Sequence, residues 1–414
     1  MTPISDPAAA ADAESLTVRF AASLRDVDAA AWDACAALPD GGPDGEDPDN
    51  PFLRHAFLSA IEESGSATAK TGWAGAHLLV EDENGTLLAA APCYLKSHSQ
   101  GEYVFDHAFA DAYARAGGRY YPKLQVCVPF TPATGPRLLV RPGERATTAR
   151  ETLVAGLQAL RAQTRASSVN ITFLPRADWE RLGGQGFLQR TDQQFHWINE
   201  GYATFDDFLN ALASRKRKVL KRERRDALQN GITVEWLTGA DLTEAVWDTF
   251  FGFYMDTGDR KWGRPYLTRQ FFSLVGERMA DRVLLIVARR EGRIIAGAIN
   301  FIGATTLYGR HWGCVEDHPF LHFEVCYYQA IDFALSRGLS RVEAGAQGGH
   351  KLVRGYRPVL TYSAHAIADP ALRRAVADYL KRERAHVEAA REELEEATPF
   401  RKSGEAPDGN DGRT

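Results

Sequence analysis

The sequence contains few cysteines and no long apolar run. Its 414 residues include five cysteines, scattered and without a C-x-x-C spacing: Cys35, Cys93, Cys127, Cys314 and Cys326. The odd number, the scattered positions and the missing C-x-x-C spacing together fit reduced thiols in a cytoplasm, not a disulfide framework or a structural zinc site. The densest apolar run, residues 283–288, is far shorter than the ~18 residues expected of a membrane-spanning helix.

The chain also lacks an excess of basic charge. It has 49 Lys and Arg against 54 Asp and Glu, so its net charge of −5 excludes a protein whose whole surface binds nucleic acid. Residues 1–15 contain no Lys or Arg and therefore lack the basic start of a signal peptide, so we expect a cytoplasmic protein. Hydrophobic residues make up 44% of the chain, enough for a large core.

Strand and helix patterns alternate along the chain. Residues 77–92 predict a hairpin that turns at Asn84-Gly85, because both residues tolerate positive φ. Leu153, Leu157 and Leu160 share one face of a predicted helix. The elements predicted in the first half are a helix at 150–163, a strand at 169–174, a short helix at 178–183 and a strand at 186–198.

The second half repeats this order. Its predicted elements are a hairpin at 283–303, a strand at 307–314, a helix at 320–337 and strands at 341–346 and 355–367. Residues 80–85 align with 287–292, and Gly186-Phe187 aligns with Gly355-Tyr356. We therefore predict a duplicated α/β unit, a mixed sheet flanked by helices with a ligand cleft between the copies, and about forty extra residues in the first copy, among them 113–136.

Three segments are predicted to lie outside the regular helices and strands. Residues 39–51 contain four prolines and predict a loop that can be mobile. Residues 1–15 and 398–414 predict disordered tails.

An amphipathic helix is predicted over residues 205–229, and it is densely basic. Eight cations fall within residues 215–225, with only Glu223 and Asp226 nearby to reduce their mutual repulsion. An anionic partner such as the phosphates of tRNA or CoA would relieve this repulsion, although a solvated helix end is the alternative. The residues assigned to this anion site are Arg215, Lys216, Arg217, Lys218, Lys221 and Arg222.

Several motifs taken together resemble the Fem-like branch of the GNAT acyltransferase superfamily, which is related to peptidoglycan aminoacyltransferases. They include residues 50–57, 101–107, 120–124, 129–132, 214–218, 261–263, 322–329, 345–351 and 354–356. The resemblance implies tandem GNAT-like domains and transfer of an acyl or aminoacyl group to an amine. It implies an acceptor-side domain at 16–198, a donor and catalytic domain at 199–397, and acyl-CoA or aminoacyl-tRNA as co-substrate, with no tightly bound cofactor.

Acyl transfer to an amine needs a base, an oxyanion stabiliser and residues that position the donor. Glu324 is the candidate base, because it shares a half-apolar helix face with Tyr327 and Tyr328. By resemblance, Lys351 holds an anionic donor or stabilises the oxyanion, and Tyr356 completes the catalytic set. The substrate-binding candidates are Asp106, His107, Arg310, Trp312, His322, Tyr328, Gln347, His350 and Arg354.

Two departures from the family pattern keep alternatives open. Gly349 stands where relatives usually have an acid, which allows an inactive protein that only binds ligands. Residues 310–315 match a CoA loop poorly, because Val315 and two acids follow the glycine. An RNA-binding accessory that uses residues 215–225 is the other alternative.

Two further candidate sites in the second half, a zinc site and a cysteine nucleophile, lack residues that their chemistry needs. His318 and His322 have the i, i+4 spacing of zinc ligands, but Pro319 separates them and no third ligand follows, so no metal is predicted. A nucleophile formed by Cys314 or Cys326 with His311 lacks an orienting Asn or Asp.

Overall fold

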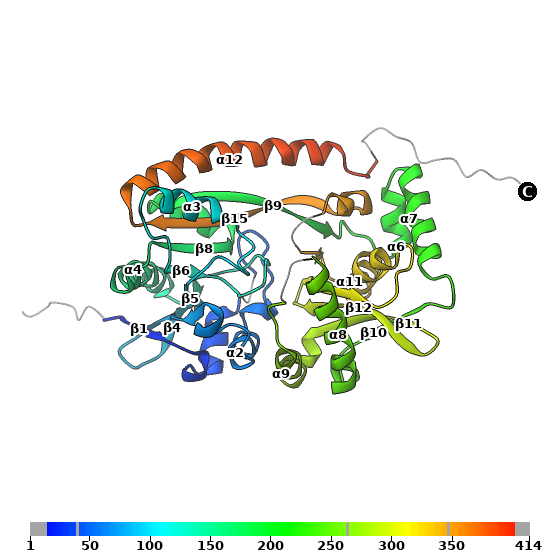
Figure 1. The fold of residues 1–414 in the computed structure, drawn as a ribbon, viewed down its shortest axis with the longest axis horizontal. Helices are drawn as coiled ribbons and strands as arrows, with labels where there is room; N and C mark the ends of the chain where they lie inside the picture. Colours follow the sequence, from blue (N-terminus) through cyan, green and yellow to red (C-terminus); the bar gives the residue numbers. More distant parts are fainter. Residues whose placement is uncertain (1–14, 39–40, 262–264, 346–347, 402–414) are drawn as a thin grey trace, which may run out of the picture.

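The computed structural model describes residues 15–38, 41–261, 265–345 and 348–401. Two α/β halves lie side by side, and a long C-terminal helix lies across both (Figure 1). The main elements of the first half are β1 (Thr17–Ala21), α1 (Ala29–Ala36), α2 (His55–Glu63), β2 (Trp73–Gly75), β3 (His77–Glu81), β4 (Leu87–Ala91), β5 (Cys93–Lys96), α3 (His107–Arg115), β6 (Lys123–Val126), β7 (Leu139–Val140), α4 (Ala146–Thr164), β8 (Ser168–Leu174), α5 (Arg176–Gly184) and β9 (Leu188–Ile198).

The second half begins with two helices that precede its strands. Its main elements are α6 (Phe205–Ala211), α7 (Ser214–Ala227), β10 (Thr233–Leu237), α8 (Glu244–Lys261), α9 (Arg269–Met279), β11 (Val283–Arg290), β12 (Arg293–Ile302), β13 (Thr306–Cys314), α10 (Leu321–Phe323), the π-helical turn η6 (Glu324–Tyr328), α11 (Gln329–Ser336), β14 (Arg341–Glu343), the 3-10 helix η7 (Gly349–Arg354), β15 (Arg357–Ile367) and α12 (Pro370–Glu396). Within the described ranges, no helix combines the length and apolar character needed to cross a bilayer.

One eleven-stranded sheet passes through both halves, in the order β10-β11-β12-β13-β14-β9-β15-β8-β6-β5-β2, and β1-β3-β4-β7 form a smaller sheet. Pro92 separates β4 from β5, since proline has no N–H to donate to a ladder. The centre of the large sheet is formed by β9 and β15. If β4 and β5 are counted as one interrupted strand, the strands on each side follow one another outward in reverse sequence order. This order is β14-β13-β12-β11-β10 beyond β9 and β8-β6-β5/β4-β3-β1 beyond β15. This symmetry is what a duplicated unit predicts.

The two central strands are exchanged between the halves. β9 follows β8 in the sequence, but it pairs with β14 of the second half, with His196 opposite Glu343. β15 in turn lies between β9 and β8. Because the sheet continues across the chain midpoint, the domain division at residues 198 and 199 stays a prediction.

Three segments differ from the sequence predictions. The basic helix at 205–229 is two helices, because Leu212 pairs with Phe400 and the Ala213 N–H donates to the Pro399 carbonyl between them. Four residues of the predicted tail, 398–401, are therefore packed against the second half, and the rest of it lies outside the described residues. The extra segment of the first half begins before residue 113, since α3 lies between β5 and β6, where the second half has only a short turn.

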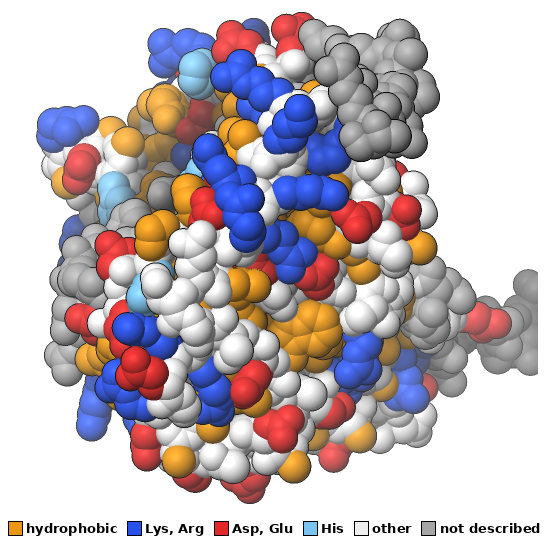
Figure 2. All heavy atoms as spheres, turned by 90° about the vertical axis from the view of Figure 1, so that its right-hand side faces the viewer, with side chains coloured by type: hydrophobic (Ala, Val, Ile, Leu, Met, Phe, Trp, Pro, Cys, Tyr) orange, Lys and Arg blue, Asp and Glu red, His pale blue; other side chains and the backbone are white. Residues whose placement is uncertain are grey.

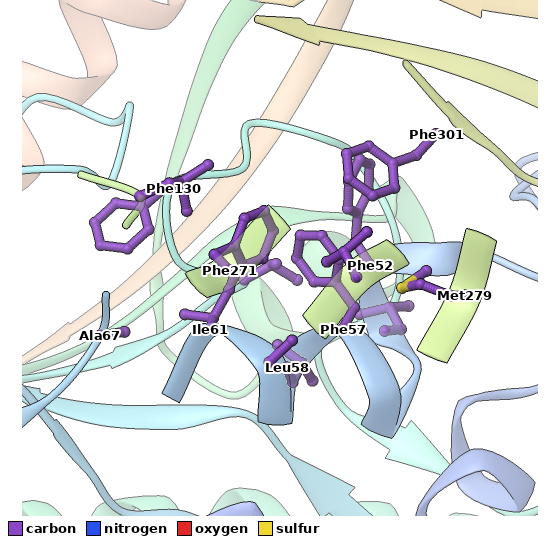
Figure 3. Packing of buried hydrophobic residues seen from close by; sticks show 14 of the residues in the cluster. Phe52, Phe57, Leu58, Ile61, Ala67, Phe130, Phe271, Met279 and Phe301 are labelled. Carbon is purple, nitrogen blue, oxygen red and sulfur yellow. The ribbon is translucent and has the colours of Figure 1, made fainter. Parts of the chain in front are cut away.

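An aromatic core joins the two halves. Phe52 and Phe57 of the first half face Phe301 and Phe271 of the second (Figure 3). The ring centroids of Phe52 and Phe301 lie 5.0 Å apart, and those of Phe57 and Phe271 lie 5.7 Å apart. Such contacts add to the apolar area that the halves bury against each other. The halves are therefore held in one arrangement around the residues described below.

Asp47 links the proline-rich loop of the first half to the second half. Its buried carboxylate accepts hydrogen bonds from the backbone N–H groups of Ala304, Thr305 and Thr306, at 2.9, 3.2 and 2.9 Å. These residues form the end of the turn between β12 and β13 and the first residue of β13, and a side chain at Gly303 would meet the carboxylate at 2.1 Å. The loop over residues 41–50 is thus pinned by Asp47.

Replacing Asp47 by alanine is expected to lower the free energy of unfolding by about 2–3 kcal/mol, because three backbone N–H groups lose a charged acceptor. Urea denaturation measures this change. Asp317→Ala is the matched control, since Asp317 is exposed and we expect a change within about 0.5 kcal/mol. Equal stability of the two variants would mean that Asp47 does not hold the halves together.

Candidate active site

The candidate site lies where two parallel strands separate. β13 and β14 are paired from Thr306 and Arg341 to Tyr308 and Glu343. Beyond this point β14 ends, while β13 continues to Cys314. The separated strands expose main-chain carbonyls that are not used in the ladder, and η7 packs at this end.

Lys351 of η7 places its ammonium at the end of β14. Its Nζ donates hydrogen bonds to the carbonyls of Ala344 and Gly345, at 2.7 and 2.9 Å. The side chain is buried, and this burial lowers the pKa of Lys351 to about 8. An ammonium has three N–H donors, so within the described part of the chain one donor is left for a bound oxygen.

Aromatic rings line the outer side of this position. The Tyr327 hydroxyl lies 2.8 Å from Nε2 of His350, and burial raises the pKa of Tyr327. The ring of His322 lies 5.2 Å from that of Trp312 and 6.1 Å from that of His350. Tyr356 is fully buried beneath Tyr327. The structure thus brings together five predicted residues on three elements and the segment before β15: Trp312, His322, His350, Lys351 and Tyr356.

Arg354 belongs to a buried polar network with α7. Its guanidinium donates to both carboxylate oxygens of Glu223, at 3.0 and 2.9 Å, and lies 3.3 Å above the ring of Phe323. The Tyr328 hydroxyl donates to the same carboxylate at 2.5 Å. Glu223, the acid within the basic run, therefore turns inward and fixes η7 against η6.

Glu324 begins η6 and is fully buried. Its carboxylate accepts hydrogen bonds from Arg224, at 2.9 and 3.2 Å, and from Gln329 at 2.8 Å. Burial alone would lower the pKa of Arg224, but Glu324 and Asp332 outweigh it and raise that pKa. Glu324 therefore holds α7 against the π-helical turn, and this turn replaces the continuous helix predicted from the sequence; such turns are frequent at functional sites.

Arg310 joins the site to the first half. It lies within β13 and donates to the Phe130 carbonyl, while its guanidinium is 5.9 Å from the ring of Tyr103. Residues 310–314 are strand, so they do not form the loop of a CoA pyrophosphate site. The cavity beside Arg310 is about 10 Å³, room for one water, and Phe130, Phe271 and Phe301 line it (Figure 3).

The structure also buries polar residues from distant parts of the sequence, of which only Arg137, in a segment that resembles an acceptor-site loop of the family, was a sequence prediction. Glu343 ends β14, and its Oε1 lies 3.9 Å from Nδ1 of His196 in β9. Burial raises the pKa of Glu343 to about 7 and lowers that of His196 to about 3. Arg137 is also buried, and among the described residues its guanidinium donates hydrogen bonds to the carbonyls of Ala133, Gly135 and Pro136 in its own loop. Glu343 and His196 come from positions far apart in the sequence, so no local motif marks them.

Asp106 and His107 lie apart from this group, at the start of α3. Asp106 is buried and accepts hydrogen bonds from Tyr120 and Lys123, whereas His107 is exposed. Lys123 also donates to Glu102 at 2.6 Å. Burial raises the pKa of Glu102 to about 7.

Gln347, the remaining predicted site residue, lies outside the described residues.

The outer face of α7 carries a basic stripe, defined by the exposed side chains of Arg215, Lys218, Lys221, Arg222 and Arg225. Figure 2 shows Lys and Arg side chains gathered on this side of the molecule. Lys221 pairs with Asp206 at 3.2 Å and Arg225 with Asp226 at 2.9 Å. Arg215, Lys218 and Arg222 have no ion pair with any described residue. Lys216 and Arg217 are half-buried, and Arg217 donates to Asn210 at 3.0 Å.

Comparison with solved structures defines the class of the fold. FemX is 13% identical, with a TM-score of 0.51 over 80% of this chain and 96% of that chain. The C-terminal domain of a putative lysylphosphatidylglycerol synthetase from Agrobacterium fabrum is 10% identical, with a TM-score of 0.51 over 87% and 96%. A conserved protein of unknown function from Bacteroides thetaiotaomicron is 11% identical, with a TM-score of 0.51 over 85% and 100%. This chain shares with these proteins a mixed α/β fold built on a large sheet, so the predicted fold class is confirmed.

A family model describes residues 23–402. It is the FemAB-like model for peptidoglycan biosynthesis and recognition, and the chain belongs to this family. The predicted resemblance is therefore confirmed. No curated protein sequence matches the chain.

Proposed function

We propose that this protein is an N-acyltransferase, which transfers an acyl or aminoacyl group from a CoA thioester or an aminoacyl-tRNA to an amine. The observation that carries the proposal is the buried ammonium of Lys351, which donates two N–H groups to the carbonyls of Ala344 and Gly345, just after β14, and donates its third to no described residue. A fixed donor of this kind stabilises the oxyanion that forms when an amine attacks a carbonyl. Family membership supports the same reaction.

The other residues have supporting roles in this proposal. Tyr327 and Tyr356 shape the floor of the site, and His350 lies at its surface. Glu324 acts as a positioning residue through Arg224, because its carboxylate already accepts three hydrogen bonds. Arg354 and Tyr328 position η7 through Glu223. We assign Asp106 and His107 to the acceptor side, with His322, Trp312 and Arg310 between the acceptor and the donor.

The test supplies both donor classes to the full-length protein. Acetyl-CoA is offered with a panel of primary amines and release of the free thiol is followed, and radiolabelled aminoacyl-tRNA is offered with the same amines and counts are followed into product. Transfer from either donor that depends on an added amine supports the proposal. Absence of transfer from both donors, together with intact binding of one of them, would instead support a ligand-binding protein.

The basic stripe of α7 is expected to contribute to binding of an RNA donor. Replacing Arg215, Lys218 and Arg222 by alanine should weaken binding of a fluorescein-labelled RNA hairpin. It should also reduce the slope of log K against log salt by about 2, since each phosphate contact contributes ~0.7–0.9. Fluorescence anisotropy at several salt concentrations measures both quantities.

The matched control removes the same charge from α12, by alanine at the exposed residues Arg374, Lys381 and Arg382. An equal loss of RNA binding in the two variants would show that only net charge matters. Unchanged RNA binding in both variants, with transfer from acetyl-CoA, would assign the donor to CoA.

A further inference from the structure

Glu343 is a buried carboxylate to which no N–H or O–H of the described residues donates a hydrogen bond. It is 3% exposed, and within the described part of the chain its Oε2 accepts no hydrogen bond. Its Oε1 lies 3.8 Å from the guanidinium of Arg341 and 3.9 Å from His196, beyond hydrogen-bonding distance in both cases. Burying a carboxylate in this way is costly, so the group either takes up a proton or receives an N–H from a ligand.

His196 does not supply that N–H. The Gln194 side chain donates from Nε2 to the Pro132 carbonyl at 2.8 Å, which directs its Oε1 toward Nε2 of His196 at 3.3 Å. An amide oxygen only accepts, so Nε2 of His196 carries the ring proton and the lone pair of Nδ1 faces Glu343. Because burial lowers the pKa of His196 to about 3, the ring stays neutral.

Glu343 directly precedes, in the chain, the two residues whose carbonyls hold Lys351. It is the last residue of β14, and the next two residues, Ala344 and Gly345, provide the carbonyls that hold Lys351. The end of β14 therefore carries the Glu343 carboxylate, which can accept a proton. The residues that follow it provide the carbonyls that hold the Lys351 ammonium. The charged and titratable groups that face Glu343 are Arg341 on its own strand, Tyr308 and Arg310 on β13, His196 on β9, Arg137 from the first half and Asp47 from the loop at 41–50.

We infer that Glu343 is a catalytic residue that takes the proton from the ammonium of the acceptor where β13 and β14 separate. This inference rests on the proposed function. The carboxylate removes one proton from R–NH3⁺, and the amine forms a C–N bond to the acyl carbon while Lys351 meets the oxyanion. When the tetrahedral intermediate collapses, the C–S or C–O bond to the donor breaks. The second proton lost by nitrogen passes to that leaving group, and Glu343 returns its proton to water.

The pH dependence of transfer tests this role. For the wild type, kcat/KM should fall tenfold for each pH unit below about 7, because the protonated carboxyl of Glu343 cannot act as a base. Glu343→Gln should lower the rate about 100-fold and abolish this acidic limb. Glu235→Gln, at an exposed strand-edge position, should retain both the rate and the limb. An acidic limb that persists in Glu343→Gln would overturn the inference while leaving the proposed function intact.

A second measurement does not require turnover. NMR titration of wild-type protein labelled with ¹³C in its glutamate carboxyls should show two signals that titrate near pH 7, from Glu343 and Glu102. Glu102→Gln identifies one of them, which assigns the other even if Glu343→Gln fails to fold. A single such signal, lost in Glu102→Gln, would overturn the inference. Failure of every donor and amine to react, with both signals present, would count against the proposed function instead.

Discussion

Replacing Lys351 by methionine is expected to reduce the rate of acyl transfer by about 100- to 1,000-fold. Methionine fills a similar volume but has no N–H to donate to the developing oxyanion. It also leaves the carbonyls of Ala344 and Gly345 without their shared donor. Steady-state kinetics with whichever donor proves active measures the loss, and we expect it mainly in kcat.

The same ammonium predicts an alkaline limit. Since burial lowers the pKa of Lys351 to about 8, the cation is present below that pH and is lost above it. The wild-type rate should therefore fall as the pH rises through about 8, and Lys351→Arg, whose charge persists, should not show that fall. Lys381→Met, on the exposed surface of α12, is the matched control and should keep the wild-type rate. Retention of rate in Lys351→Met would contradict the role assigned to this residue.

The second large effect concerns stability. Replacing Arg354 by methionine should lower the free energy of unfolding by about 3–5 kcal/mol, because it leaves the buried carboxylate of Glu223 without a counter-ion. The tyrosine hydroxyl of Tyr328 remains as its only described partner. Urea denaturation followed by circular dichroism measures the change.

The double variant isolates the charge itself. Glu223→Gln combined with Arg354→Met removes both members of the pair, so it should recover a large part of the stability that Arg354→Met loses. If the two single losses simply add, the ion pair contributes no coupling and Arg354 acts through its packing on Phe323.

The sequence predicts most strands and few of the contacts between them. Asn84-Gly85 and Glu291-Gly292 mark hairpins by local turn chemistry, and both occur in the structure. The break between α6 and α7 has no such signal, because it depends on Phe400, nearly two hundred residues away. Tertiary contacts override periodicity at this position.

The site shows the same division. The residues of η6 and η7 are close in sequence, so sequence motifs could predict Glu324, Lys351 and Tyr356 as members of one site. The position of Glu223 was informative, because it is an acid within a run of basic residues. Such an acid is a candidate for a side chain that points into the protein rather than into solvent. The positions of Glu343 and His196 were not informative, since they meet only because two distant strands lie side by side.

The exchange of central strands has a consequence for synthesis on the ribosome. β8 and β9 emerge long before β15, which separates them in the finished sheet. Until β15 is translated, both strands present open edges that could pair with other nascent chains. Chaperone holding during this interval is therefore the step on which the yield of this protein should depend.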